Sequence, residues 1–325
     1  MSPGAHISPR EQLHALLHRL NHRIVGQSRL CQRLVIALLA DGHLLVEGAP
    51  GLAKTRAISS LAGAIAADFH RIQFTPDLLP SDITGSDIYR PETGSFTFQP
   101  GPLFHNLVLA DEINRTPAKV QAALLEAMGE RQISVGAKTY PLPPLFLVRA
   151  TQNPIEQEGT YPLPEAQLDR FLLHVLVDYP DAAAERRILA LARDEAAGTS
   201  GTPFSPLTQD VIFAARREAL AVHMDSAVEE YLVQLILATR NTKGYGHNMK
   251  NWINYGASPR ATIALDRCAR VMAWLDDRDY VTPDDIRDIA PDVLRHRILL
   301  NYEAEAEGVT TGQAIAQLLA AVPSA

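Results

Sequence analysis

Long apolar runs, closely spaced cysteines and an excess of basic residues are all missing from this sequence of 325 residues. No apolar run reaches the roughly 18 residues that a membrane-spanning helix needs, so we expect no membrane span. The two cysteines, Cys31 and Cys268, lie in no ligand or nucleophile pattern, which favours reduced packing thiols in the cytoplasm. The formal net charge of −7 argues against a protein that coats nucleic acid, because such proteins need a basic face.

A secretory signal, repeats, low-complexity tracts and long blocks of charge are also missing. Near the N-terminus, Ser8, Pro9 and Glu11 form the capping-box pattern of a helix start with proline at its first position. Leucines then follow on one helical stripe, at positions Leu13, Leu16, Leu17 and Leu20. Charged residues off this stripe interrupt any secretory core, so we expect an amphipathic docking helix and a cytoplasmic protein. The length suggests two domains, and the hydrophobic content of 46% is enough for buried cores.

The most informative segment is a glycine-rich turn between an apolar run, residues 44–46, and a helix-like stretch, residues 58–67. A strand, such a turn, a lysine, a hydroxyl and a helix together cradle nucleotide phosphates. Lys54 is expected to reach the outer phosphates, and the Thr55 hydroxyl to bind Mg²⁺. The usual pattern has glycine before the lysine, where Ala53 stands here, and a plain turn is the alternative. The residues expected to hold the nucleotide are Gly48, Ala49, Pro50, Gly51, Leu52, Ala53, Lys54 and Thr55.

A second apolar run, residues 107–110, ends in two acids, Asp111 and Glu112. All-apolar strands are typical of parallel sheets covered on both faces, and ligands bind at the carboxyl ends of such strands. Asp111 is expected to join Thr55 in holding Mg²⁺ with the nucleotide, and Glu112 to polarise a water for attack on the terminal phosphate. A strand that happens to end in solvated acids is the alternative for this motif by itself. A base dedicated to water implies hydrolysis of ATP rather than transfer to an acceptor.

Five strand-like runs alternate with helix-like stretches, which predicts an α/β fold with a five-stranded parallel sheet. The runs are residues 44–46, 70–74, 107–110, 145–148 and 171–177. Residues 85–101 and 131–143 look like inserted β-hairpins, either ordinary surface hairpins or contacts for a partner. The clearest linker spans residues 198–203, and strand signals disappear beyond it. We therefore predict a nucleotide-binding α/β core with the N-terminal helix in residues 1–200 and a small all-α domain in residues 201–325.

Two arginines are candidates for catalytic roles. Arg170 ends a short helix that enters the last strand, where it is badly placed for its own phosphates and well placed to reach a neighbour's site. A surface ion pair with Asp169 or Glu165 is the alternative for Arg170. Arg260 follows the helix-capping pair Ser258-Pro259, and its charge opposes the helix dipole, which suggests an anionic partner such as phosphate. A surface salt bridge is the alternative for Arg260.

Three further residues are candidates for contacts with the nucleotide. Asn153 ends the strand after the acids, where a neutral amide can hold the attacking water or the terminal phosphate. A turn residue before Pro154 is the alternative. Val25 and Gly26 precede the second helix and are expected to form a wall for the adenine ring.

Together these segments resemble AAA+ ATPases of the MoxR type, from Ile24 to Arg297. Residues 48–55 are similar to the family's own phosphate loop, in which alanine before the lysine is normal. Residues 109–115 resemble its acidic strand end, and residues 151–154 its sensor strand. Residues 159–171 carry the most family-specific stretch and place Arg170 as the arginine finger. Residues 256–261 resemble the second sensor, with Arg260 left unassigned between its own subunit's site and a neighbour's.

The resemblance implies an AAA+ P-loop NTPase fold with a lid domain, and ATP and Mg²⁺ as cofactors. It also implies a homo-oligomer, a hexameric ring with nucleotide between subunits, that remodels or activates a partner protein complex in a chaperone-like way. A partner with a von Willebrand factor A domain and a role in metal-cofactor insertion or enzyme maturation are implied in the same way. Two alternatives stay open: a DNA-acting motor of the helicase or clamp-loader kind, and a nucleotide-dependent scaffold with negligible hydrolysis.

Overall fold

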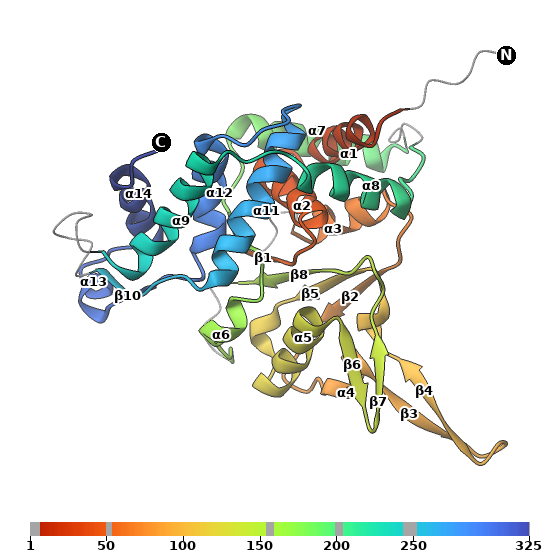
Figure 1. The fold of residues 1–325 in the computed structure, drawn as a ribbon. Coiled ribbons are helices and arrows are strands. Elements are labelled where there is room, and N and C mark those ends of the chain that lie inside the picture. The colour runs from red at the N-terminus through yellow and green to blue at the C-terminus, as the bar shows by residue number, and fades with distance from the viewer. Residues whose placement is uncertain (1–6, 50–53, 154–158, 199–203, 243–251, 325) are drawn as a thin grey trace. The chain divides into compact units, whose positions relative to one another are not determined.

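A parallel β-sheet of five strands organises the N-terminal part of the chain, in the order β2-β5-β8-β1-β9 (Figure 1). The pairs β2–β5, β5–β8 and β1–β8 are parallel. The strands are β1 (Leu44–Gly48), β2 (Phe69–Gln73), β5 (Leu107–Asp111), β8 (Leu147–Gln152) and β9 (Leu173–Val177). The predicted five-stranded parallel sheet is therefore confirmed.

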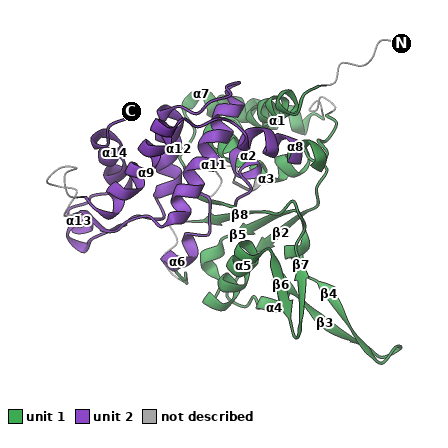
Figure 2. Cartoon of the chain, viewed as in Figure 1, with its two compact units in different colours: residues 1–35, 43–163, 175–212 green, residues 36–42, 164–174, 213–325 purple. Residues whose placement is uncertain are grey.

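The structure is a computed structural model that describes residues 7–49, 54–153, 159–198, 204–242 and 252–324. The chain forms two compact units, which Figure 2 shows in different colours. Unit 1 comprises residues 1–35, 43–163 and 175–212, and unit 2 comprises residues 36–42, 164–174 and 213–325. The predicted boundary after residue 200 falls among residues 199–203, outside the described residues, and stays a prediction.

The helices of unit 1 begin where the sequence patterns indicate. In α1 (Pro9–Arg23) the Ser8 side chain accepts the backbone N–H of Glu11, and the Glu11 carboxylate accepts the backbone N–H of Ser8. Three leucines of its stripe are fully buried. In α5 (Ala118–Glu130) Val120, Leu124 and Met128 lie at helical spacing and are buried as well. Further helices and turns that lie wholly or partly in this unit are α2 (Ser28–Leu39), α3 (Lys54–Ala62), α4 (Pro80–Thr84), η1 (Pro102–Phe104), η2 (Ile113–Arg115), α7 (Ala182–Ala196) and α8 (Gln209–Leu220).

Both predicted hairpins are present in unit 1 and lie side by side (Figure 1). The first is β3 (Gly85–Arg90) with β4 (Ser95–Pro100), and the second is β6 (Gln132–Val135) with β7 (Lys138–Pro141). The ring of Phe98 stacks on that of Tyr140 with centroids 3.9 Å apart, so aromatic packing joins the two hairpins. At the outer part of the first hairpin, Tyr89 and Phe96 are exposed and pair across the strands.

Two strands begin two residues later than the predicted runs: β8 at Leu147 and β9 at Leu173. Leu145 and Phe146 are buried but precede β8, which begins at Leu147 opposite Leu107. The Asn106 side chain donates to the Leu145 carbonyl at 2.9 Å, so an amide occupies the position where a ladder bond would otherwise form. The strand then runs on to Gln152, which carries its carboxyl end to the candidate site.

Unit 2 is mainly helical, as predicted for the lid. Its helices are α6 (Glu165–Leu168), α9 (Ser226–Arg240), α11 (Pro259–Leu275), α12 (Pro283–Leu294), α13 (Tyr302–Ala306) and α14 (Thr311–Ala321). Its interior contains the fully buried Trp274 of α11. A short antiparallel pair, β10 (Ile253–Tyr255) with β11 (Leu299–Leu300), was not expected from the sequence. Such brief runs carry no periodic signal that distinguishes a strand from a loop.

Candidate active site

The two acids and a threonine meet at the carboxyl ends of two neighbouring parallel strands in unit 1. Asp111 is the last residue of β5, and Thr151 lies at the corresponding end of β8. The Thr151 Oγ1 donates a hydrogen bond of 2.6 Å to Oδ1 of Asp111 and accepts one of 2.9 Å from the backbone N–H of Glu112. Asn153 follows the same strand and is buried. The sheet therefore brings Asp111, Glu112 and Thr151 into one hydrogen-bonded group, with Asn153 just beyond it along the chain.

Edge strand β2 supplies two further side chains that no sequence motif marked. Arg71 donates to Oδ2 of Asp111 through Nη2 at 2.6 Å and Nε at 3.2 Å. Gln73 donates from Nε2 to Oε2 of Glu112 at 2.8 Å. Residues 71 and 73 share one face of the strand, and Gln73 pairs with Asp111 in register. The sequence shows that residues 71 and 73 lie on the same face of a strand. Only the sheet order shows that this strand is paired with β5.

The backbone of Glu112 is in the left-handed region, with φ 58° and ψ 51°. Non-glycine residues rarely adopt this conformation, and its cost of about 1–2 kcal/mol has to be offset by the surroundings. Arg115, on the following turn, is 3.2 Å from Oε2 of Glu112 through Nη1. A strained residue at the end of a sheet, with its carboxylate held by neighbouring side chains, is typical of functional sites.

The candidate phosphate loop connects β1 to the start of α3. Gly48 ends β1 where an added Cβ would lie 2.5 Å from the carbonyl oxygen of Val177, so only glycine fits beside β9. Ala49 is buried. Pro50, Gly51, Leu52 and Ala53 lie outside the described residues. Lys54 and Thr55 open α3, a helix of nine residues whose N-terminus directly follows the glycine-rich loop, the arrangement that binds phosphate in nucleotide-binding proteins.

The segment predicted to wall the adenine ring packs against the start of α7. Val25 is buried. Gly26 has φ +79°, and a Cβ there would lie 2.9 Å from Cβ of Ala184 and 3.0 Å from Cβ of Pro180. Glycine is thus required by both conformation and close packing. The contact with a purine stays a prediction.

Arg149 is a fully buried cation in the middle of β8. It lies two residues before Thr151, on the same face of the strand. Its Nε, Nη1 and Nη2 have no hydrogen-bond partner among the described residues. Burial lowers the pKa of Arg149 to about 9, against the opposing effects of Asp111 and Cys31. Burial also raises the pKa of the Cys31 thiol to about 12, which fits the packing role predicted for this cysteine.

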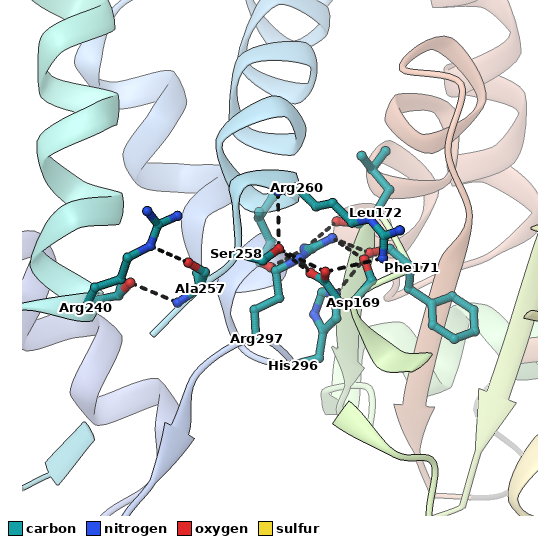
Figure 3. Close-up of polar contacts among 11 residues, drawn as sticks. Asp169, Phe171, Leu172, Arg240, Ala257, Ser258, Arg260, His296 and Arg297 are labelled. Atoms are coloured by element: carbon teal, nitrogen blue, oxygen red, sulfur yellow. Dashed lines mark hydrogen bonds and ion pairs between the residues drawn. The ribbon is translucent and has the colours of Figure 1, made fainter. Parts of the chain in front are cut away.

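In unit 2, the residue next to Arg170 is the centre of a polar cluster (Figure 3). Asp169 follows α6 and accepts hydrogen bonds from Ser258 Oγ at 2.9 and 3.0 Å and from Arg297 Nε at 2.8 Å. Arg260 Nη1 lies 3.5 Å from Oδ2 of Asp169, with its side chain 56% exposed. The surface salt bridge considered as an alternative for Arg260 is therefore present, and its acid is Asp169. Ser258 caps α11 by accepting the backbone N–H of Arg260, as its sequence pattern predicts.

Three consecutive residues after α12 hold the backbone of residues 169–174, which we call the Arg170 segment. Arg295 donates to the carbonyl of His174 at 2.8 Å, and His296 Nε2 lies 3.0 Å from the carbonyl of Phe171. Arg297 donates to the carbonyls of Phe171 at 2.5 Å and Leu172 at 3.2 Å. His296 is buried, and burial together with nearby Arg297 lowers its pKa well below 6.5. The ring is therefore neutral at physiological pH.

Comparison with known proteins decides the family. Residues 43–173 match the family described as "ATPase family associated with various cellular activities (AAA)", and residues 248–318 match the AAA lid domain. The Chaperone MoxR1 of Mycobacterium tuberculosis is 43% identical over 329 residues, covering 98% of this chain and 85% of that protein. The chain belongs to the MoxR family of AAA ATPases.

A second relative and a solved structure are also similar to this chain. The Protein MoxR of Methylorubrum extorquens is 34% identical, covering 85% of this chain and 84% of its own length. A crystal structure of a Cytophaga hutchinsonii protein described as an ATPase superimposes with a TM-score of 0.90 at 46% identity, covering 98% of this chain and 96% of that one. As an AAA ATPase, the chain binds and hydrolyses ATP.

The chemistry of the MoxR-family site suits a magnesium nucleotide. Asp111 carries an oxygen donor of the kind Mg²⁺ prefers, and Thr55 supplies a hydroxyl in the sequence. Within the described ranges no three His, Cys, Asp or Glu side chains gather into a metal site. Mg²⁺ usually keeps several waters and is bound through one or two carboxylates beside the substrate phosphates. Among the described helices, none is long and apolar enough to cross a membrane.

Proposed function

We propose that this MoxR-family chain is a Mg²⁺-dependent ATPase that acts as a homo-oligomeric ring and uses ATP hydrolysis for chaperone-like remodelling of a partner protein. The observation that carries the proposal is the group formed by Asp111, Glu112 and Thr151 at the carboxyl ends of β5 and β8. Carboxyl ends of parallel strands are where open α/β sheets bind their ligands.

Within the core, each residue has a role that follows from its chemistry. Lys54 and the amides of residues 48–55 hold the phosphates at the start of α3. Asp111 and Thr55 hold Mg²⁺, which neutralises charge on the phosphates when bound. Glu112 accepts the proton of the attacking water, and the left-handed backbone at this residue aims its carboxylate. Asn153 orients the water or the terminal phosphate.

The proposal of a ring depends on two arginines of unit 2. Arg170 stabilises charge on the terminal phosphate of a neighbouring subunit, and Arg260 couples the bound nucleotide to the lid. A site that is complete only when another copy supplies its arginine requires head-to-tail contacts between subunits, and such contacts form a ring when the rotation between subunits closes. Six subunits are the number that the family resemblance implies.

The chaperone-like action is supported by the relative that is named Chaperone MoxR1. Its sequence is 43% identical to this chain almost from end to end. A partner with a von Willebrand factor A domain, and a task in metal-cofactor insertion or enzyme maturation, are hypotheses that the family resemblance alone supports.

The Glu112→Gln variant tests the hydrolytic centre. The amide keeps the shape of the side chain but cannot accept a proton, so ATP binding should persist while turnover falls by at least a hundredfold. Glu126→Gln is the matched control, because this exposed glutamate on α5 lies outside the site, and it should hydrolyse ATP at the wild-type rate. Unchanged steady-state hydrolysis by E112Q would refute the assignment. Held in ATP, the same variant is the bait for isolating the partner protein.

Mixing inactive subunits tests the shared site. R170A subunits should still bind ATP but lack the arginine that reaches the neighbouring site. K54A subunits should lose phosphate binding but keep Arg170. Mixed rings should therefore recover part of the wild-type hydrolysis, at sites where R170A supplies the nucleotide and K54A the arginine. Absence of recovery at every mixing ratio, in samples shown to co-assemble, contradicts a site completed by a neighbour.

A further inference from the structure

The carboxylate of Asp169 is shared by three groups of the lid (Figure 3). Ser258 and Arg260 come from the start of α11, and Arg297 comes from the residues that follow α12. Oδ1 accepts from Arg297 Nε at 2.8 Å and from Ser258 Oγ at 3.0 Å, and Oδ2 accepts from Ser258 Oγ at 2.9 Å. One side chain next to Arg170 therefore joins two separate parts of the lid.

The two arginines at Asp169 are held very differently. The side chain of Arg297 is only 2% exposed, and its guanidinium also donates to the carbonyls of Phe171 and Leu172. Removing its acid would leave an uncompensated buried charge, so this pair is permanent in the folded chain. Arg260 is more than half exposed and lies 3.5 Å from Oδ2, beyond ordinary hydrogen-bond length. A pair of this kind is weak and is readily exchanged for another anion.

The backbone of Arg260, in contrast, is fixed to the same carboxylate. The Ser258 hydroxyl donates to Asp169 and accepts the backbone N–H of Arg260 at 3.2 Å. This short chain of hydrogen bonds sets the first turn of α11 relative to Asp169. Arg260 therefore has an anchored backbone and a guanidinium that can change partners.

We propose that Asp169 is a positioning residue for ATP hydrolysis. It is the counter-ion that Arg260 exchanges for a nucleotide phosphate, and through Ser258 and Arg297 it holds the Arg170 segment on the lid. The inference rests on the proposed function in that it takes Arg260 as a phosphate ligand and Arg170 as the arginine finger. What it adds is a physical link between them, because Asp169 is covalently next to Arg170 and loses Arg260 when nucleotide binds.

The link has a direction that can be measured. With nucleotide absent, Asp169 competes for the Arg260 guanidinium and weakens ATP binding. With nucleotide bound, Asp169 keeps Ser258 and Arg297 and so still holds the backbone next to Arg170. Removing the charge of Asp169 should therefore raise the affinity for ATP, because Asp169 no longer competes for Arg260. It should also lower kcat, because the backbone next to Arg170 is no longer held.

Asp169→Asn in the full chain is the primary test. We expect ATP to bind about twofold to fivefold more tightly, the range that an exposed ion pair allows. We expect kcat to fall on the order of tenfold or more, because a misplaced arginine contributes little to the transition state. The matched control is Asp266→Asn, which removes an aspartate of α11 from its surface pair with Arg270 and should leave both values unchanged.

Two further variants keep the test decisive if D169N is poorly folded. Ser258→Ala removes the hydroxyl bridge and leaves the buried Arg297 pair intact, so kcat should fall severalfold without loss of ATP affinity. In the double variant D169N/R260Q the gain in affinity should vanish, because no guanidinium remains to be released. Weaker ATP binding in parallel with lower kcat, in a variant with a lowered Tm, is the signature of a merely structural role and overturns the proposal.

The outcomes also separate this inference from the function on which it rests. If R260Q alone leaves affinity and kcat unchanged, Arg260 is not a phosphate ligand, although E112Q can still abolish turnover. If R260Q is impaired while D169N and S258A behave as wild type, the role of Arg260 stands and the role of Asp169 is refuted.

Discussion

The hydroxyl of Thr151 donates a hydrogen bond of 2.6 Å to Oδ1 of Asp111, and the same oxygen accepts the backbone N–H of Glu112 at 2.9 Å. One side chain on β8 therefore holds the carboxylate of Asp111 and the backbone of Glu112 at the end of β5. Neither acid depends on its own strand alone for its position.

Thr151→Val should remove both hydrogen bonds while it keeps the volume of the side chain. The Glu112 N–H loses its acceptor, and an unmade hydrogen bond at a partly buried site costs about 1–3 kcal/mol. We expect kcat for ATP hydrolysis to fall about tenfold or more, with a modest loss of stability. Thr151→Ser keeps the hydroxyl and should retain most of the activity. Equal kinetics for T151V and wild type would show that the acids are oriented by other groups.

Arg71 donates to Oδ2 of Asp111, the carboxylate that we propose holds Mg²⁺. The Arg71 side chain is 50% exposed and that of Asp111 is 13% exposed, so we expect Mg²⁺ to compete with the guanidinium for this carboxylate. Arg71→Gln should therefore lower the Mg²⁺ concentration for half-maximal hydrolysis by about threefold, within the range of an exposed ion pair. The Mg²⁺ midpoint for thermal stabilisation by nucleotide should shift in the same direction. Arg90→Gln, on the exposed hairpin, is the control, and a rise in either midpoint contradicts competition at Asp111.

Arg149 is a buried cation without a hydrogen-bond partner among the residues that the structure describes. Arg149→Met should raise the free energy of unfolding by about 1–3 kcal/mol at neutral pH, because the unmet cost of burying a polar group disappears. The pKa of Arg149 is lowered to about 9, so the folded chain releases this proton above that pH, and the advantage of R149M should shrink there. Arg149→Lys keeps a buried charge, so its free energy of unfolding should not rise above that of the wild type. Denaturant titrations at neutral pH and near pH 10 measure the gain in the free energy of unfolding and its dependence on pH. A lower free energy of unfolding for R149M than for the wild type at neutral pH would refute the prediction.

His296 makes the stability of the lid sensitive to acid. Burial lowers the pKa of His296 well below 6.5, so below that pH the unfolded chain takes up a proton that the folded chain does not. The free energy of unfolding should therefore be at its full value above pH 6.5 and fall as the pH drops towards the folded-state pKa. His296→Gln keeps an N–H for the Phe171 carbonyl and cannot charge, so its urea midpoint should change less between pH 7.5 and 5. His18→Gln, at an exposed position on α1, should follow the wild type.

Local patterns were sufficient for much of this protein. A capping box, a glycine-rich turn before Lys54 and two acids after an apolar run each depend on residues close together in the chain. The alternation of buried strands and helices determined the parallel sheet for the same reason, and the hairpins followed from short-range alternation. The start of β8 was less predictable, because an amide from Asn106 rather than hydropathy sets where pairing begins.

The sequence by itself determined that the candidate phosphate, metal and water residues follow buried strands, and the carboxyl ends of parallel strands share one edge of a sheet. Only the tertiary structure decided which side chains form hydrogen bonds and ion pairs with these residues. Arg71 and Asp111 are 40 residues apart, and Asp169 and Arg297 are 128 apart. Such pairs depend on strand order and helix packing, which bring distant segments together and leave no periodic trace in either segment.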